Sequence, residues 1–281
     1  MTHLKHNRSG FAHVFLLLIG IAVIITGLVY YALSNKKAKT TATDPGTSSA
    51  QFSSDAVTRG KYLSHDQCEG EGSKKLGSAP MNTTDLSNIQ PLGLVAGGHV
   101  TPVDHQYYFG KNLKAAPSTY DVLAPGDGTL VNIEVRPKGN GPSDVRGVIS
   151  YSCTFFSYFD LTNSLAPDIA KQMPSGWEKI NGPQKVKVPV KQGQVIAKVG
   201  GQSLDFAVWD TTKTLDGLLI AKAYNNYEPW KISTVRPLDY YSDEVKAKVL
   251  PYYARQAEPR DGKPDYDIDG KAVGNWFKIG T

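Results

Sequence analysis

The sequence predicts a mainly β fold, an antiparallel β-sheet sandwich or barrel with few short helices, preceded by an N-terminal transmembrane helix. Two observations carry this prediction. Between about residues 95 and 210, short runs rich in β-branched and aromatic residues alternate with glycine-containing turns, a pattern typical of antiparallel sheets. Ahead of them lies one uninterrupted apolar segment, residues 11–33, without Asp, Glu, Lys or Arg. The first pattern predicts the sheets and the second predicts the membrane helix.

Residues 11–33 are long enough to cross a membrane as one helix. At about 1.5 Å per residue they reach about 33 Å, against a hydrocarbon core of roughly 30 Å. Lys5 and Arg8 of the short basic N-terminus 1–10 precede this segment and three lysines follow it, so the positive-inside rule gives no clear orientation. A basic start, a long apolar run and no clear cleavage site favour an uncleaved signal anchor. We therefore expect a single-pass protein of the cell membrane with an extracytoplasmic body. A cytoplasmic body and a cleaved, secreted protein stay open as alternatives.

The rest of the chain divides by composition. Residues 34–56 are rich in Ser, Thr, Ala, Lys and Gly, and predict a flexible stalk. Residues 57–94 form an N-terminal lead of the globular body, and residues 95–210 form its β core. Residues 211–281 predict a C-terminal extension with a helix and a β-hairpin.

Charge and cysteine content restrict the partners. The chain has a net charge of +5, with 31 Lys and Arg against 26 Asp and Glu. Residues 1–39 hold the whole excess, so the body is neutral and gives no indication of nucleic-acid binding. Cys68 and Cys153 are the only cysteines. They either pair in an oxidising compartment or stay as two buried thiols.

Several segments of the body have clear local signals. Residues 120–136 predict a strand, a tight turn at Gly126–Gly128 and a second strand. Residues 147–159 predict one long strand. Further strands are expected at 185–190, 195–199 and 204–209, and helices at 243–253 and near 165–172.

A family resemblance appears in three of these segments. They read "YDVLAPGDGTLVNIEV", then "SYFDL", then "VKVPVKQGQVIAKVGGQSLDFAVWD". Their order and spacing resemble the core of the lysostaphin-type zinc endopeptidases, which cleave peptidoglycan and share the duplicated hybrid motif. The resemblance covers about residues 95–210. It implies an antiparallel β core with a groove for a peptide cross-bridge or glycan strand.

The resemblance also implies where a zinc site would lie. The positions of the three zinc ligands correspond to His99, Asp104 and Asp205, and the two assisting histidines correspond to Asp160 and Ser203. His105 is an additional polar side chain in the same segment as Asp104. A hydroxyl and a carboxylate cannot move protons at neutral pH as two imidazoles do. The resemblance therefore implies a degenerate site and leaves an enzymatic activity uncertain.

Three interpretations of this site stay open. His99, Asp104 and Asp205 could bind a divalent metal, zinc in the resembled family. The histidines could instead frame an ordered loop whose carboxylates accept backbone hydrogen bonds. A hydrolase with an altered mechanism is the third.

Other motifs have ordinary interpretations beside functional ones. Asp265, Asp267 and Asp269 match the first half of a calcium loop, but Trp276 stands where the bidentate Glu belongs, which favours a hairpin turn at Gly270. Asn82 begins a glycosylation sequon. A cluster of aromatic residues could line a ligand groove with alternate members, for which we select Tyr151, Phe156 and Tyr158.

These features together predict a membrane-anchored, non-catalytic, peptidoglycan-endopeptidase-like β domain with a binding or scaffolding role at the cell envelope. Its expected partners are the membrane and peptidoglycan, or another envelope glycan or protein. The alternative function is a metal-dependent hydrolase of peptidoglycan or peptide with an atypical Asp-rich site.

Overall fold

The structure is a computed structural model that describes residues 55–70, 72–95, 99, 101–138, 143–225 and 228–277. The predicted membrane helix at 11–33 and nearly all of the predicted stalk lie outside these residues. Among the described residues, no helix combines the length and the hydrophobicity needed to cross a bilayer.

The described part of the chain is mainly β. Its strands are β1 (Leu86–Gln90), β2 (Gln106–Gly110), β3 (Tyr120–Leu123), β4 (Gly128–Arg136), β5 (Asp144–Ser150), β6 (Phe155–Thr162), β7 (Ser164–Leu165), β8 (Gly182–Val190), β9 (Val195–Val199), β10 (Leu204–Asp210) and β11 (Thr234–Val235). Its helices are short: α2 (Ala56–Leu63), α3 (Pro167–Ala170), α4 (Ala221–Asn225) and α5 (Asp243–Val249), with single 3₁₀ turns between elements.

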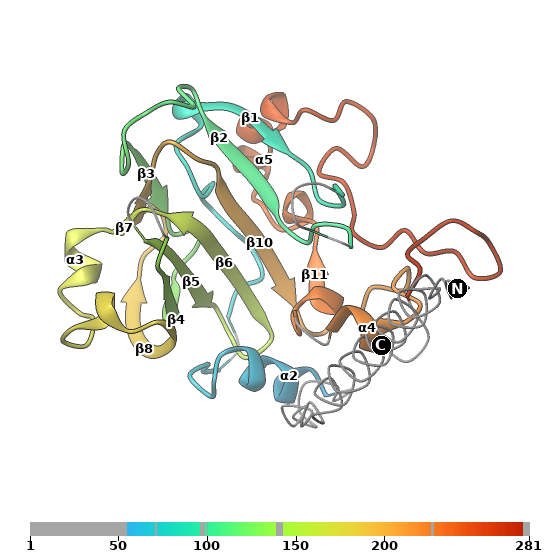
Figure 1. The fold of residues 1–281 in the computed structure, drawn as a ribbon, viewed down its shortest axis with the longest axis horizontal. Coiled ribbons are helices and arrows are strands. Elements are labelled where there is room, and N and C mark those ends of the chain that lie inside the picture. The colour runs from blue at the N-terminus through green and yellow to red at the C-terminus, as the bar shows by residue number, and fades with distance from the viewer. Residues whose placement is uncertain are drawn as a thin grey trace, which may run out of the picture. The chain divides into compact units, whose positions relative to one another are not determined.

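The strands form two antiparallel sheets. The large sheet has the order β1-β2-β10-β6-β5-β4-β8, and β11 pairs with β10. The small sheet has the order β3-β9-β7. Figure 1 shows β6 and β10 side by side near the middle of the large sheet, with α2 beside the turn that joins β5 and β6. The predicted mainly β, antiparallel class with few short helices is confirmed.

Alternation along the strands gives the large sheet two different faces. One face carries Phe155, Phe159 and Phe206 into the main core, together with Val122 and Ile196 of the small sheet. The other face carries a separate cluster of buried residues, against which Leu63, Cys68 and Trp230 pack: Val131, Val148, Phe156, Tyr158, Ala207 and Trp209. We call this second face the site face, because the predicted site residues of β6 and β10 have the same parity as Tyr158 and Trp209.

Two local predictions are corrected by the pairing. The strands predicted on either side of Gly126–Gly128 exist as β3 and β4, but they belong to different sheets and do not pair. The long strand predicted at 147–159 is a hairpin of β5 and β6. Its turn is closed by the amide N of Tyr151, which donates to the carbonyl of Phe155 over 3.0 Å. Apolar residues continue through this turn, which hid it from the alternation pattern.

The C-terminal segment packs on the main core through Val245 and Val249 of α5. This helix starts at the N-cap Ser242, whose Oγ accepts from the amide N of Val245 over 3.3 Å, and it covers the first part of the helix predicted at 243–253. At Gly270 the chain makes a turn, with the amide N of Ile268 donating to the carbonyl of Val273 over 3.1 Å. No strand is assigned between residues 254 and 277, so a turn stands where the hairpin was predicted.

Candidate functional site

The predicted site residues converge on the site face at the start of β10. In the strand register Asp205 lies between Tyr107 of β2 and Asp160 of β6. All the carboxylates concerned are buried, with Asp104 1% and Asp205 6% exposed. The sheet therefore brings Asp104 and Asp205 close together although 101 positions separate them in the sequence.

His105 lies between two of these carboxylates. Its Nδ1 is 3.2 Å from Oδ1 of Asp104, and its Nε2 is 3.3 Å from Oδ2 of Asp205. The first contact has hydrogen-bond geometry, whereas the second is an ion pair without it. Burial lowers the pKa of His105, but the nearby carboxylates of Asp104 and Asp205 outweigh it and raise the pKa from 6.5 to about 9. At neutral pH the ring is an imidazolium that bridges the two aspartates.

Both oxygens of Asp104 are engaged by the protein. Oδ1 faces His105, and Oδ2 accepts a hydrogen bond from Nε1 of Trp230 over 2.5 Å. Burial raises the pKa of Asp104, but the bond and charge of His105, with the charge of Lys231, lower it from 3.8 to about 2. Asp104 is thus the fixed negative partner of the imidazolium.

Asp205 has weaker support. Ser203 donates from its Oγ to Oδ1 of Asp205 over 3.2 Å, and His105 faces Oδ2. Burial outweighs these two partners and raises the pKa of Asp205. Ser203 replaces an assisting histidine in the resembled pattern, and its hydroxyl orients Asp205.

Asp160 is held by two arginines. Nε of Arg146 donates to Oδ2 over 2.9 Å, and Arg136 donates to Oδ1. The amide N of Leu161 also donates to Oδ1 over 2.6 Å. Asp160 is 2% exposed, so its negative charge is compensated entirely inside the protein.

The donor set does not fit a zinc ion as it stands. His99 is partly exposed, and its ring centroid is 5.4 Å from that of His105, which puts it beside the imidazolium rather than on the carboxylates. The two aspartates that correspond to ligands face an imidazolium where a metal would need free lone pairs. Within the described residues, no three His, Cys, Asp or Glu side chains are arranged to hold a metal ion. The carboxylates of the site are instead compensated by His105, Arg136 and Arg146.

A groove of about 760 Å³ opens above these ion pairs. Its size lies within the range of about 300–1,000 Å³ that is usual for ligand sites. Its lining combines carboxylates, arginines and aromatic rings with some aliphatic side chains. Lining residues include His99, His105, Tyr107, Arg136, Arg146, Tyr158, Asp160, Ser203, Asp205 and Trp230.

The three aromatic residues selected for a ligand face have different positions. Tyr158 lines the groove. Phe156 is on the same face but fully buried, where it packs in the cluster below α2. Tyr151 is on the opposite side, with its ring 5.3 Å from Phe155 of the main core, so its assignment to the ligand face is wrong. The hairpin turn between Tyr151 and Phe156 breaks the alternation on which that assignment depended.

Other sequence features are structural. Cys68 and Cys153 form a disulfide that joins the segment after α2 to the β5–β6 turn. Asp267 accepts hydrogen bonds from the hydroxyl of Tyr224 and, over 2.8 Å, from the amide N of Asn275, so it ties the C-terminal loop together. Asn82 is exposed just before a 3₁₀ turn.

Sequence reasoning missed Arg146 and Trp230. Arg146 stands in a strand at a position that alternation assigns to the site face, and this was the available signal. Trp230 lies 126 residues from its partner Asp104, and no local sequence pattern indicates their hydrogen bond.

No model of a known protein family matches this chain, and no curated relative matches it. Among solved structures, it is similar to Csd3 of Helicobacter pylori, with 21% identity over 49% of this chain and 32% of that one, at a TM-score of 0.30. It is also similar to a protein described as a peptidase M23 from Pseudomonas aeruginosa, with 15% identity over 56% and 54% of the two chains and a TM-score of 0.31. A zinc-containing peptidase from Vibrio cholerae has 18% identity over 52% and 40%, with a TM-score of 0.29. The chain thus spans about a third to a half of the length of these proteins.

Proposed function

We propose that this chain is an envelope protein whose β domain binds peptidoglycan or its fragments without cutting them. The apolar segment at 11–33 anchors it in the cell membrane, with the folded body outside the cytoplasm. The carrying observation is the set of internal ion pairs at the base of the groove. Asp104, His105 and Asp205 form one, and Asp160 with its two arginines forms the other.

These ion pairs argue against water activation. A hydrolytic site needs a base with a free lone pair beside a reactive water. The imidazole of His105 is protonated at neutral pH because its pKa is raised to about 9, and the carboxylate of Asp160 faces guanidinium groups. A ligand can still bind on the rim, where Tyr107 and Arg136 offer an aromatic ring and a cation.

The test combines pull-down and turnover on the full-length protein in detergent. We expect it to co-sediment with purified peptidoglycan sacculi, to do so in the presence of EDTA, and to release no soluble fragments. Tyr107→Ala should weaken co-sedimentation, because Tyr107 lines the groove. Lys171→Ala is the matched control, because the side chain of Lys171 is 76% exposed outside the groove.

The alternative is a metal-dependent hydrolase. Stoichiometric zinc in the purified protein, together with release of wall fragments that EDTA abolishes, would replace the binding proposal with this one. Absence of co-sedimentation for the wild type would also refute the binding proposal.

A further inference from the structure

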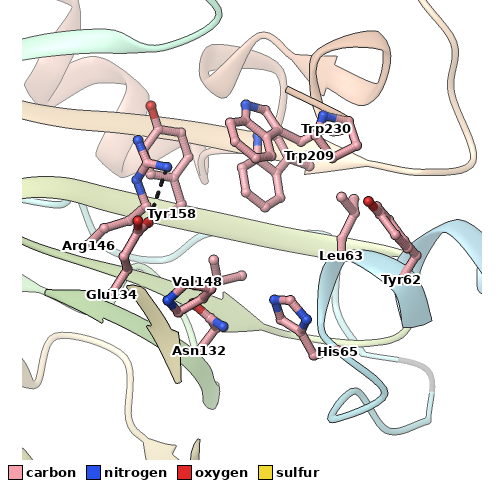
Figure 2. Close-up of a pocket in the computed structure, with 12 residues that line it drawn as sticks. Tyr62, Leu63, His65, Asn132, Glu134, Arg146, Val148, Tyr158, Trp209 and Trp230 are labelled. Carbon is pink, nitrogen blue, oxygen red and sulfur yellow. Dashed lines mark ion pairs between the residues drawn. The ribbon is translucent and has the colours of Figure 1, made fainter. Parts of the chain in front are cut away.

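A second cavity lies on the site face beside the groove, and it has a volume of about 280 Å³. We call it the indole pocket. Figure 2 shows Tyr62 and Leu63 of α2 on one side of it and Arg146 with Glu134 on the other. Its remaining lining residues are His65, Asn132, Val148, Tyr158, Pro183, Trp209, Pro229 and Trp230. The volume suits one small ring rather than an extended chain.

Aromatic rings form one wall of the pocket. The rings of Trp209 and Trp230 are stacked, with centroids 5.4 Å apart and an interplanar angle of 19°. Tyr158 continues this wall, with its ring 5.3 Å from that of Trp209. Such a wall offers flat apolar area at low conformational cost, because aromatic side chains have few rotatable bonds. It fits a ligand with an apolar ring face.

A β-bulge turns an amide toward this wall. The pairing of β4 shifts register between Leu130 and Asn132 with both of its neighbours. Beyond the shift, Ile133 lies in the main core while Asn132 and Glu134 line the indole pocket. The extra residue in β4 therefore turns the amide of Asn132 into the indole pocket, whereas strict alternation would turn it toward the main core.

Two N–H donors of the pocket have no acceptor. Nδ2 of Asn132 and Nε1 of Trp209 are buried without a hydrogen-bond partner among the described residues. Asn132 is 5% exposed and Trp209 is 3% exposed, so bulk water does not readily accept hydrogen bonds from these two donors. Buried donors are almost always paired in native proteins, and an unpaired one indicates a missing partner. Both need an acceptor oxygen.

The charges around the pocket favour a neutral ligand. The guanidinium of Arg146 lies 5.5 Å from the ring centroid of Tyr158 and 5.7 Å from that of Trp230, so a second cation would be repelled from these faces. Glu134 lies 3.6 Å from Arg146 and disfavours an anion. Partial burial, together with the charge of Lys185, lowers the pKa of His65.

We propose that the indole pocket binds one N-acetylated pyranose unit. An apolar ring face would lie on the indoles, and acetamido and hydroxyl oxygens would accept from Asn132 and Trp209. The acetyl methyl would contact apolar lining such as Leu63 or Val148. This inference deepens the proposed function and rests on it for the source of the sugar, a wall glycan. The affinity of the pocket for a free sugar can be measured independently of binding to sacculi.

The probe is N-acetylglucosamine, titrated into the full-length protein in a detergent without sugar headgroups. Tryptophan fluorescence and saturation-transfer NMR should report saturable binding with a Kd of about 1 mM, the scale that ligand efficiency sets for a molecule of this size. Glucose lacks the acetamido group and should bind about tenfold more weakly.

The decisive variant is Asn132→Leu, which keeps the size of the side chain and removes the donor. It should weaken sugar binding about tenfold while the melting temperature stays the same or rises, because an unpaired buried donor is removed. A purely structural asparagine would give the opposite pattern, a lower melting temperature with unchanged affinity. Trp209→Phe removes the second donor with the ring face kept and should also weaken binding, whereas Lys171→Ala should change neither quantity.

The outcomes separate the two proposals. Sugar binding that Asn132→Leu weakens, without co-sedimentation with sacculi, supports the pocket and refutes the proposed function. If the protein co-sediments with sacculi but shows no saturable sugar binding at sugar concentrations well above the millimolar range, the pocket proposal alone is refuted. Saturable binding that Asn132→Leu and Trp209→Phe both leave unchanged also refutes it, because the sugar would then bind elsewhere.

Discussion

Asp205 of β10 lies directly opposite Asp160 of β6 in the antiparallel register. Like charges in this position destabilise a sheet, and both residues are buried. Each has its own counter-charge: His105 faces Asp205, whereas Arg136 and Arg146 face Asp160. The ion pairs of the site are therefore a condition for this part of the sheet to form.

Arg146→Met should destabilise the protein by about 2–3 kcal/mol, because it leaves Asp160 with one arginine and Glu134 with none. Urea unfolding at pH 7 measures this. The double variant Arg146→Met, Asp160→Asn should recover most of the loss, since the uncompensated charge is then gone. As a control, Lys198→Met removes a half-exposed pair with Asp121 and should cost less than about 1 kcal/mol. Equal losses for both single variants would contradict the assigned role of Arg146.

The stability of the wild type should fall in mildly alkaline solution. The pKa of His105 is about 9 in the folded chain and 6.5 as its ordinary value, so its contribution is complete below pH 6.5 and is lost as the pH rises through 9. The loss corresponds to about 3 kcal/mol. Chemical denaturation at a series of pH values measures it. His105→Gln should be less stable at pH 6 and should lack this slope; a wild type with constant stability from pH 6 to pH 10 would mean that the ring is neutral.

Asp261→Asn should stabilise the protein at pH 7. Burial outweighs the attraction of Arg236 and raises the pKa of Asp261 from 3.8 to about 6, so the group favours folding below pH 3.8 and this advantage is lost as the pH rises through 6. The amide can still accept from the amide N of Leu238, as the carboxylate does over 3.1 Å. We expect a gain of up to about 3 kcal/mol at pH 7 and almost none at pH 4 in thermal or urea unfolding. Asp168→Asn is the control at an exposed ion pair far from Asp261 and should change stability by less than about 1 kcal/mol at pH 7.

Gly60→Ala should destabilise the protein, although alanine is the better helix former by about 1 kcal/mol. A Cβ at Gly60 would lie 1.7 Å from the carbonyl oxygen of Cys153 and 3.2 Å from the ring of Phe156. α2 would have to move away from the sheet, at a cost of about 2 kcal/mol. Thermal unfolding and limited proteolysis after Lys61 would detect this. Lys61→Ala, at an exposed position of the same helix, should be close to neutral, and a stabilised Gly60→Ala would refute the packing of α2.

The sequence predicts this fold best where local signals and burial agree. The predicted strand at 195–199 coincides with β9, and those at 185–190 and 204–209 lie within β8 and β10, because glycine-containing turns bound these short apolar-rich runs. The β5–β6 turn was missed because apolar Tyr151 and Cys153 continue the pattern through it. The partition of β3 and β4 into different sheets depends on pairing with distant strands, which no local pattern encodes.

The site was predicted in part. Asp104, His105, Asp160, Ser203 and Asp205 do lie together, as the family resemblance implied. The charge state of these residues was not predictable, because it depends on which cation pairs with which aspartate in the folded chain. Alternation along β5 places Arg146 on the site face but does not indicate its ion pair with Asp160. No pattern in the sequence indicates the contact between Trp230 and Asp104.

Trp230 belongs to the segment that the sequence pattern treats as an addition to the β core, yet it lines both the groove and the indole pocket. A chain cut after Asp210 would retain most of the large sheet and lose the partition between these two recesses. Its bare tryptophan on β10 would then face solvent, and Asp104 would lose an indole donor. The last quarter of the chain thus completes the walls of both recesses on the sheet surface.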